Sequence, residues 1–454
     1  MEQLATAGEV LAALSHALDL VEGQPAGHAV RTSMIAMSIA HELGLEEGLC
    51  DSLFYAALLK DSGCSTNSAR IHKMFGGDEF LAKRQVKYID WTDPIESVKY
   101  AVKTINPQAG LVEKLQRMAA MAGSPVKAMD EATAARCTRG ASIAIQLGFD
   151  IHTAAAVQSL DEHWNGKGSP SHKAGEAIPI LARILCISQT LEIFVTSFGI
   201  EAGFEMLDAR RGTWFDPELV RVAECLKNSS LWTDHANHVA GNMVRLYEPE
   251  SAMSKPLTDL DKVSQAFANV IDAKSSFTSQ HSTRVNEYAM LLAQYFGFDL
   301  ERTIVLRRAA LLHDIGKLGV PNSVLDKPGS LTKEEFDLVK LHPRFTYEIL
   351  RQIRGQERMT EVASNHHERI DGKGYWRGLS GKELDLDMRI LATADVFDAL
   401  SATRPYREAL PLSQVFSIME RDAGYHLDAS CVGALRDIYF GAISVSERSG
   451  IRVL

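Results

Sequence analysis

The chain repeats itself, and this repetition limits its fold more than any other feature of the sequence. Four segments of the first half resemble four segments of the second half, in the same order. The matched pairs are residues 27–45 with 280–298, 54–63 with 307–316, 161–170 with 367–376, and 178–194 with 386–400. Four matches in one order are hard to obtain by chance, so we expect one fold to be used twice.

Apolar residues recur at three- and four-residue spacing along most of the chain, and alternating β-branched runs are few, which indicates helices. A chain of 454 residues is also too long for one ordinary hydrophobic core. We therefore predict an all-α fold of two tandem helical bundles. A stretch containing Pro and Ser near residue 250 predicts a first domain at 1–246, a linker at 247–262 and a second domain at 263–454.

The charge and the composition exclude several classes of protein. A formal net charge of −10 argues against the broad basic surface that a nucleic-acid polymer or an anionic membrane requires. Apolar runs such as residues 178–187 are shorter than the roughly 20 residues of a bilayer span, so we expect no membrane insertion. The six cysteines form no C-x-x-C pair and the N-terminus does not resemble an export signal, so we expect a cytoplasmic protein.

Five histidines and two aspartates of the second half lie in the repeated segments or on helices between them. They are His281, His313, Asp314, His342, His366, His367 and Asp395. A single histidine on an apolar helix face is more often a hydrogen-bonded core residue than a ligand. An ionised aspartate such as Asp395 is costly in an apolar helix without a partner or a metal, and seven such groups cannot all satisfy one another. Together they predict a shared metal site, with His342 near the end of a helix that starts at the capping box of Thr332 and Glu335.

The chemistry of these seven side chains narrows the choice of metal. Five imidazoles and two carboxylates are too rich in nitrogen for Mg²⁺ or Ca²⁺, which favour oxygen ligands. Seven ligands also exceed the four that a tetrahedral ion takes. We therefore predict two ions bridged by Asp314, an arrangement suited to hydrolysis of a phosphodiester.

The first half lacks most of the equivalent polar residues. Lys60 stands in place of His313, Leu160 and Asp161 in place of His366 and His367, and Gln189 in place of Asp395. His28 and Asp61 alone remain of the set, and a lysine facing the site would repel a divalent cation. We expect the first half to be a degenerate, non-catalytic copy with a regulatory or dimerising role.

Several motifs of the second half resemble the HD-GYP domain, over roughly residues 265–440. They are HDIGK at 313–317, HHERIDGKGY at 366–375, ADVFDAL at 394–400 and RPYR at 404–407. HD-GYP proteins are HD-superfamily phosphodiesterases that act on cyclic di-GMP and, for some members, on 3′,3′-cyclic GMP-AMP. The resemblance implies an enzyme that hydrolyses a cyclic dinucleotide to a linear one, and a first half similar to a degenerate HD domain.

The same resemblance implies roles for individual residues. All seven side chains of the predicted cluster would be metal ligands, with iron or manganese as the metals. Asp314 and Lys317 would be catalytic. The substrate contacts would be Lys317, Asp398, Arg404 and Arg407. Tandem arrangements of this kind are similar to cyclic GMP-AMP phosphodiesterases, which favours that substrate without separating it from cyclic di-GMP.

The sequence departs from the family pattern at three positions. Trp376 replaces the proline of the Gly-Tyr-Pro signature, which puts partner contacts and substrate preference in question. Phe277 stands where members with three metals carry a glutamate, so two metals are expected. Thr346 replaces a glycine that usually follows the His342-Pro343 pair, and the sequence offers no reason for it.

Two other functions compete with the predicted enzyme. The second half could be a non-catalytic module that binds the dinucleotide or a protein, an alternative prompted by Trp376 and by the degenerate first copy. A different HD phosphohydrolase, such as a nucleotidase, fits the double histidine and the RPYR segment poorly. A homodimer is the assembly expected if the first half dimerises.

Overall fold

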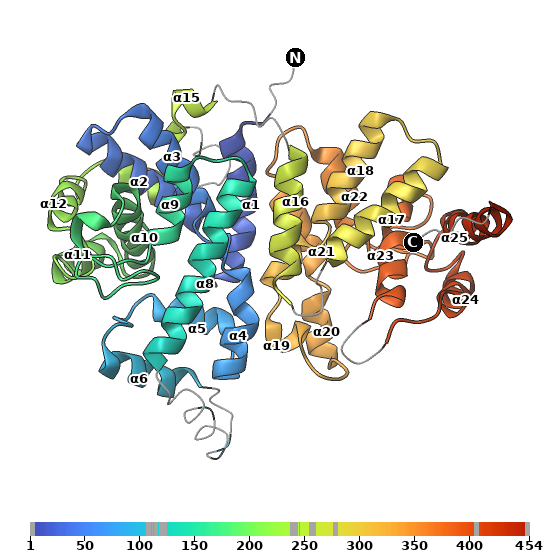
Figure 1. The fold of residues 1–454 in the computed structure, drawn as a ribbon, viewed down its shortest axis with the longest axis horizontal. Coiled ribbons are helices and arrows are strands. Elements are labelled where there is room, and N and C mark those ends of the chain that lie inside the picture. The colour runs from blue at the N-terminus through green and yellow to red at the C-terminus, as the bar shows by residue number, and fades with distance from the viewer. Residues whose placement is uncertain are drawn as a thin grey trace. The chain divides into compact units, whose positions relative to one another are not determined.

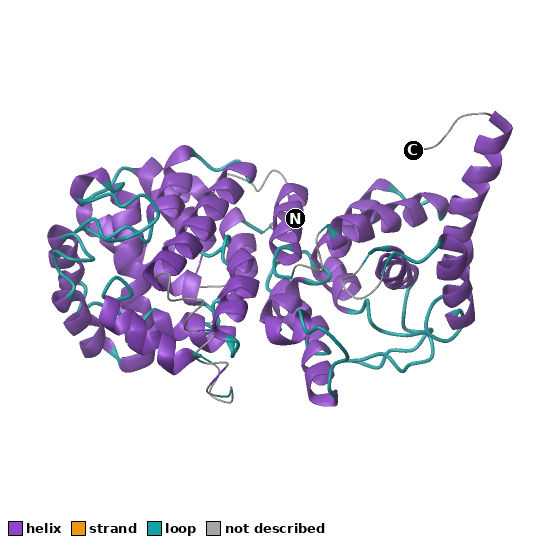
Figure 2. Ribbon diagram, turned by 60° about the horizontal axis from the view of Figure 1, so that its bottom comes forward, coloured by secondary structure: helices purple, strands orange, loops and turns teal. Residues whose placement is uncertain are grey.

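The structure is a computed structural model that describes residues 5–105, 110, 112, 117, 125–236, 244, 246–253, 260–275, 280–403 and 408–449. Figures 1 and 2 show helices joined by loops throughout this part of the chain. The only strand-like pairings among the described residues are two isolated bridges, Arg211 with Phe215 and Ala423 with Leu427. The predicted all-α fold is confirmed.

The chain forms two compact units. The first contains Met1–Lys262 together with Pro321–Leu325 and Gln352–Gly355, and the second contains Val263–Val320, Asp326–Arg351 and Gln356–Leu454. Part of the predicted linker is helical, because it includes α15 (Glu250–Met253) and the first residues of α16 (Leu260–Asp272).

The first unit is a bundle built around three core helices. They are α2 (His28–Leu43), α3 (Glu47–Leu59) and α10 (Ile180–Phe198). Helices α1 (Ala7–Val21) and α9 (Ile151–Ser159) pack on this core. The surrounding helices are α4 (Ser65–Phe75), α5 (Glu79–Val86), α6 (Pro94–Thr104), α8 (Pro125–Gln146), α11 (Ile200–Ala209), α12 (Pro217–Cys225) and α13 (Leu231–Ala236), with the short helix η1 (Gly175–Ala177).

The second unit repeats this plan. Helix α17 (His281–Tyr295) packs on α18 (Leu300–Leu312) and α23 (Leu386–Ser401), as α2 packs on α3 and α10. The other elements of this unit are η2 (Ile315–Gly319), α20 (Lys333–Val339), α21 (His342–Leu350), α22 (Glu357–Ser364), α24 (Leu412–Asp422) and α25 (Ala429–Ser449). The short helix α19 (Asn322–Leu325) belongs to the first unit. The predicted reuse of one fold is therefore visible in the packing of the core helices.

The repetition extends to a turn that the sequence comparison did not single out. Each isolated bridge closes a turn that ends at an aspartate, Asp216 in the first unit and Asp428 in the second, and each aspartate accepts a backbone N–H of the helix that follows. Arg183 pairs with Asp216 at 2.5 Å, and Arg389 pairs with Asp428 at 3.1 Å. The same ion pair thus fixes the same turn in both copies.

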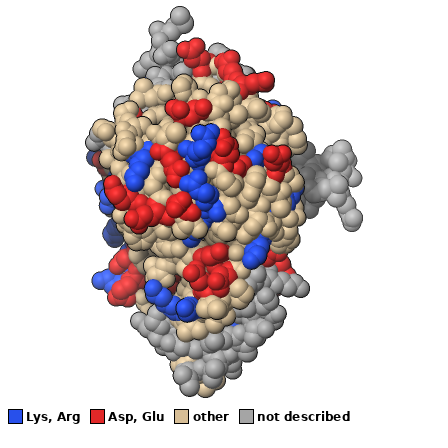
Figure 3. Space-filling view, turned by 90° about the vertical axis from the view of Figure 1, so that its left-hand side faces the viewer, with Lys and Arg blue, Asp and Glu red and all other residues tan. Residues whose placement is uncertain are grey.

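Helix α10 is longer and more apolar than the sequence reading allowed. Its 19 residues would be enough to cross a membrane by length and composition, but 72% of the apolar window is buried inside the protein. Such burial is typical of the central helix of a bundle, which is apolar all round. On the face of the molecule drawn in Figure 3, lysines and arginines are interspersed with aspartates and glutamates, so this face carries no broad basic patch.

Candidate metal centre

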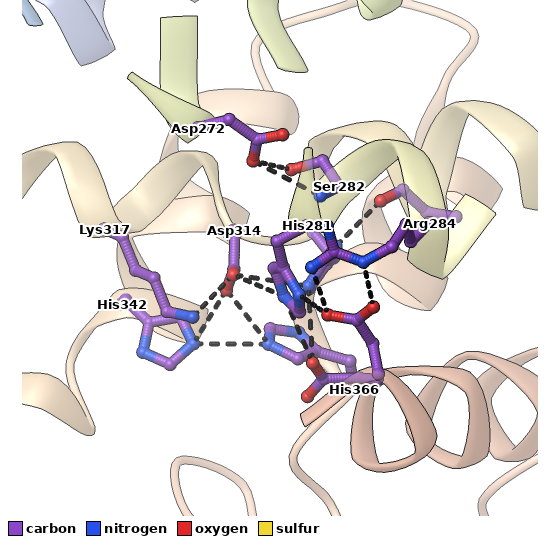
Figure 4. A network of polar contacts seen from close by, with 12 residues as sticks. Asp272, His281, Ser282, Arg284, Asp314, Lys317, His342 and His366 are labelled. Atoms are coloured by element: carbon purple, nitrogen blue, oxygen red, sulfur yellow. Dashed lines mark hydrogen bonds and ion pairs between the residues drawn. The ribbon is translucent and has the colours of Figure 1, made fainter. Parts of the chain in front are cut away.

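The seven predicted ligands come from several elements of the second unit and meet in one cluster. Figure 4 labels four of them, His281, Asp314, His342 and His366. The seven positions are the first residue of α17 for His281, the C-cap of α18 for His313, the residue before η2 for Asp314, the first residue of α21 for His342, the turn after α22 for His366 and His367, and the middle of α23 for Asp395. All are buried except His367, which is half-buried. The structure therefore brings together every residue of the predicted set.

The position of His342 within its helix differs from the prediction. The capping box of Thr332 and Glu335 forms, but the helix that it starts, α20, ends at Val339. Proline favours the first turn of a helix, where its missing N–H has no helical partner. Because Pro343 lies in such a turn, His342 begins the next helix instead of lying near the end of the earlier one.

Four of the histidines are oriented by contacts at Nδ1. The contacts are His281 with Asp398 Oδ2 at 2.7 Å, His313 with the Ala310 carbonyl at 2.7 Å, His342 with the Val339 carbonyl at 2.5 Å, and His366 with the Ala363 carbonyl at 2.7 Å. Carbonyl and carboxylate oxygens accept hydrogen bonds, so Nδ1 carries the proton in each ring. The lone pair of Nε2 is then available to the cluster, as metal-binding imidazoles require.

Asp314 lies between two pairs of imidazoles. Its Oδ2 atom is 3.3 Å from His281 Nε2 and 3.4 Å from His313 Nε2. Its Oδ1 atom is 3.5 Å from His342 Nε2 and 3.6 Å from His366 Nε2. Because each oxygen faces its own pair, one carboxylate could bridge two cations.

The cluster fits transition-metal ions. His313 Nε2 and Asp314 Oδ1 are buried and have no hydrogen-bond partner among the described residues, and such groups cost about 1–3 kcal/mol each unless something binds them. Three overlapping groups have ligand atoms within 4.8 Å of one another: His281, His313 and Asp395; His313, Asp314 and His366; His342, His366 and His367. A donor set of imidazoles with few carboxylates suits first-row transition metals better than Mg²⁺ or Ca²⁺.

Electrostatics keep most of these groups in the form that binds metal. Burial lowers the pKa of His342 to about 3, with a contribution from the Lys317 ammonium. Burial and His366 also lower the pKa of His367, so these imidazoles are neutral. Burial alone would raise the pKa of Asp314, but His313 and Lys317 hold it well below its usual range, and this carboxylate is ionised.

His281 is the exception among the imidazoles. Burial lowers its pKa, but Asp314, Asp395 and Asp398 surround the ring and raise the pKa well above the usual range. Three carboxylates next to one imidazole are an excess of negative charge, which a proton or a bound cation would balance. Asp272 fixes this end of α17, because its Oδ1 atom accepts the Ser282 N–H at 3.2 Å and the Ser282 hydroxyl at 2.7 Å (Figure 4).

Asp398 contacts the Nδ1 atom of His281, whereas Asp314 and Asp395 face its Nε2 atom. Asp398 is fully buried, its Oδ2 atom accepts from His281 Nδ1, and Arg284 donates to both of its oxygens at 2.5 and 3.0 Å. Both carboxylate oxygens are engaged inside the protein, and the predicted contact of Asp398 with the substrate stays a prediction. Asp398 is better placed to orient His281, and Arg284 to hold Asp398.

The first unit contains the same relay. Arg31 Nε donates to Glu192 Oε1 at 2.6 Å, and the other oxygen of Glu192 contacts His28 Nδ1. Arg31 and Glu192 correspond to Arg284 and Asp398 in the repeat. The sequence reading missed Arg284, although an arginine three residues after the histidine and an acidic residue on the last core helix occur in both copies.

Thr346, which had no explanation in the sequence, fixes the loop that carries two of the ligands. Its hydroxyl donates to the His313 carbonyl at 2.8 Å and accepts the Gly316 N–H at 3.1 Å. A Cβ atom on Gly316 would lie 2.0 Å from the His342 carbonyl oxygen, so only glycine fits there. The loop from His313 to Gly316 is thus packed directly against α21.

Lys317 lies at the edge of the cluster, where its Nζ atom is 2.5 Å from Asp314 Oδ2 and its side chain is 21% exposed. The side chain is therefore partly exposed, as the predicted contact with the substrate requires. The other two predicted substrate contacts, Arg404 and Arg407, lie outside the described residues, as does Phe277.

The loop that carries the signature covers one side of the cluster. The Tyr375 ring stacks on His367, with 4.7 Å between ring centroids. Trp376 has a φ of 100° and packs on the ring of Tyr347. Buried Glu368 holds the loop by accepting the backbone N–H groups of Arg377 and Leu379, each at 2.9 Å, a function that the sequence reading missed.

The corresponding position of the first unit contains a lysine ammonium. Lys60 Nζ lies 2.9 Å from His28 Nε2 and forms an ion pair with Asp61. Burial opposes the charge of Lys60, but Asp61 and Asp19 outweigh it and raise the pKa of this lysine. A permanent cation therefore lies between the two residues that correspond to His281 and Asp314.

Comparisons with known proteins agree with this geometry. The HD domain family matches residues 108–219 and 265–431. A protein of Vibrio cholerae named 3′3′-cGAMP-specific phosphodiesterase 3 is 39% identical over 94% of this chain and 93% of its own length. A cyclic di-GMP phosphodiesterase response regulator of Xanthomonas campestris is 41% identical over 37% of this chain and 45% of its own length.

A solved structure resembles the whole chain. The crystal structure of a cyclic GMP-AMP specific phosphodiesterase of Vibrio cholerae superposes with a TM-score of 0.67 and 35% identity, over 96% of this chain and 97% of that one. Both the family match and the full-length relative include the two halves. The chain belongs to the HD domain family, and its second unit is a member of the HD-GYP phosphodiesterases within that family.

Proposed function

We propose that the second unit is a metal-dependent phosphodiesterase that opens 3′,3′-cyclic GMP-AMP, and cyclic di-GMP less well, to a linear dinucleotide. The observation that supports it most strongly is the convergence of five imidazoles and two carboxylates around Asp314, whose two oxygens face different pairs of histidines. The preference for cyclic GMP-AMP is supported by the relative that matches along nearly the whole chain.

His281, His313, Asp314, His342, His366, His367 and Asp395 would hold two divalent transition-metal ions, iron or manganese, with Asp314 between them. When bound, such ions activate water and neutralise charge on the phosphate during an in-line displacement. Water adds to phosphorus, one ester P–O bond breaks, and a proton passes to the departing ribose oxygen.

The other residues orient these groups and the substrate. Asp398 and Arg284 hold the ring of His281, and Thr346 holds the loop of His313 and Asp314. Lys317 would put its ammonium beside a phosphate oxygen, since its Nζ atom is near Asp314 and its side chain is partly exposed. Tyr375 offers an aromatic face at the edge of the cluster, against which a purine can stack.

The experiment compares turnover of the two cyclic dinucleotides by the full chain and its Asp314→Ala variant, with chromatographic separation of the products. We expect the wild-type protein to linearise 3′,3′-cyclic GMP-AMP faster, and the variant to lose at least about 100-fold in rate because the metals contribute several kcal/mol. Asp337→Ala, at an exposed aspartate of α20, is the matched control and should remain active. Tight binding of either dinucleotide by metal-loaded protein without any product would contradict the proposal.

A further inference from the structure

The first unit has a partly enclosed cavity beside the position that corresponds to the metal centre of the second. Its volume is about 80 Å³, and its wall includes Asp161 and Gln189, the counterparts of His367 and Asp395. A cavity of this size has room for a phosphate-sized group or for a few waters. Binding pockets for whole nucleotides are several times larger.

The wall of this cavity carries an excess of positive charge. Lys83, Lys87 and Arg136 contribute three cations, and Glu22 and Asp161 contribute two anions. Burial raises the pKa of both carboxyl groups, but Lys83 for Glu22 and Arg136 for Asp161 outweigh it and lower the pKa, so both carboxylates are ionised. The wall thus lacks one negative charge.

Lys87 is the cation with donors to spare. Lys83 Nζ donates to the Val21 carbonyl and to Ser68 Oγ, each at 2.9 Å, and lies 3.2 Å from Glu22. Lys87 Nζ is 3.8 Å from Glu22, which is beyond hydrogen-bond distance. The ammonium of Lys87 can therefore donate to a bound anion without breaking a hydrogen bond of the protein.

Gln189 supplies a second unsatisfied group in the same wall. Its Nε2 atom donates to Asp161 Oδ1 at 3.4 Å, whereas its buried Oε1 atom accepts no hydrogen bond from the described residues. Gln189 is 5% exposed, so bulk water does not supply the missing hydrogen bond to Oε1. Oε1 needs a donor, and a bound group that satisfies both Gln189 and Lys87 must offer an O–H as well as a negative charge. Trp91 and Trp214 complete the wall with aromatic surface.

We propose that this cavity is a binding site for a phosphate group, with a charged oxygen on Lys87 and a P–OH donating to Gln189 Oε1. A carboxylate of similar size has no O–H at neutral pH, and the net positive charge of the wall disfavours a metal cation. The phosphate group comes from free inorganic phosphate, which keeps a P–OH at neutral pH, or from a nucleotide phosphomonoester bound as its monoanion, since the second pKa of such an ester is about 6. The site is independent of whether the second unit hydrolyses a cyclic dinucleotide.

The test is a titration of the full chain with sodium phosphate, followed by tryptophan fluorescence because Trp91 and Trp214 line the cavity. Phosphate can also bind at the metal centre, so the readout is the difference between variants. Lys87→Gln should weaken the fluorescence-detected binding at least about tenfold, since it removes a charged hydrogen bond. Lys99→Gln, at an exposed lysine of α6, should bind as the wild type does, and Trp91→Phe should reduce the signal.

A second variant, Gln189→Met, keeps the size of the side chain and removes the acceptor, and it should also weaken binding. Far-ultraviolet circular dichroism of each variant verifies that the fold is retained. A parallel titration with 5′-GMP identifies the source: binding of both ligands indicates a phosphomonoester site, and binding of phosphate alone indicates a site for the free ion. Unchanged phosphate binding in Lys87→Gln and Gln189→Met would overturn the proposal.

Discussion

Replacing Asp398 with asparagine tests whether this residue positions a metal ligand or contacts the substrate. The carboxylate accepts the Nδ1–H of His281 at 2.7 Å and both donors of Arg284. Asparagine has nearly the same shape but offers one acceptor oxygen and one NH₂ group. The NH₂ group would face either the His281 N–H or a donor of Arg284, so one of these contacts becomes repulsive.

The expected effect follows from the role of such outer contacts. Removing the partner that orients a ligating histidine typically costs 10–100-fold in metal affinity or activity, which is about 1.4–2.7 kcal/mol. The loss of charge adds to this effect, because Asp398 is one of the carboxylates that favour positive charge at His281. We therefore expect metal affinity to fall by about 10–100-fold while KM for the dinucleotide changes little at saturating metal.

Metal affinity is measured by competition with a chelator of known affinity, and KM and kcat are measured with the metal in excess. Arg284→Lys serves as the companion variant, since it keeps the charge and loses the two-pronged contact, and a smaller loss of metal affinity is expected. An unchanged metal affinity together with a raised KM would refute the positioning role and support direct contact of Asp398 with the substrate.

Three further predictions concern stability, metal content and pH. Thr346→Val keeps the shape of the side chain but leaves the His313 carbonyl and the Gly316 N–H without a partner. The free energy of unfolding in urea should fall by about 2–4 kcal/mol, whereas Thr346→Ser should lower it by about 1 kcal/mol. Equal stability of the two variants would contradict the role of the hydroxyl. Gly316→Ala should lower the metal content found by mass spectrometry, because its Cβ would lie 2.0 Å from the His342 carbonyl oxygen, and a fully loaded variant would show that the loop can move. In the first unit, burial raises the pKa of Glu192, but His28 and Arg31 outweigh it and lower the pKa to about 2. The contribution of this carboxylate to stability is complete above its ordinary pKa of 4.5 and is lost as the pH falls towards 2. Glu192→Gln should therefore flatten the acid side of a plot of unfolding free energy against pH. An unchanged plot would argue against this ion pair.

The sequence predicted the helical class, the duplication and the residues of the cluster because each leaves a local pattern. His281, for example, precedes a stripe of apolar residues on one helix face, and Asp395 interrupts an apolar helix where a charge is costly. The repeat also identified Lys60 as a substitution, because the same segment carries a histidine in one copy and a lysine in the other.

The remaining features depend on contacts between residues far apart in the chain. Thr346 matters because its helix packs against the loop of His313, and Glu368 because its carboxylate reaches the backbone nine and eleven residues later. Neither contact follows from spacing or composition. Arg284 is different, since its counterpart Arg31 and the paired acidic residues occur at equivalent positions of both copies, and this signal was present in the sequence.

The account depends most on the claim that the cluster around Asp314 holds metals that the reaction requires. The direct measurement is the metal content per chain of purified protein, by inductively coupled plasma mass spectrometry, alongside turnover of 3′,3′-cyclic GMP-AMP before chelation, after it, and after iron or manganese is returned. The account predicts about two ions per chain, loss of turnover with loss of the ions, and recovery when they are returned. Full turnover by protein stripped of transition metals would contradict it.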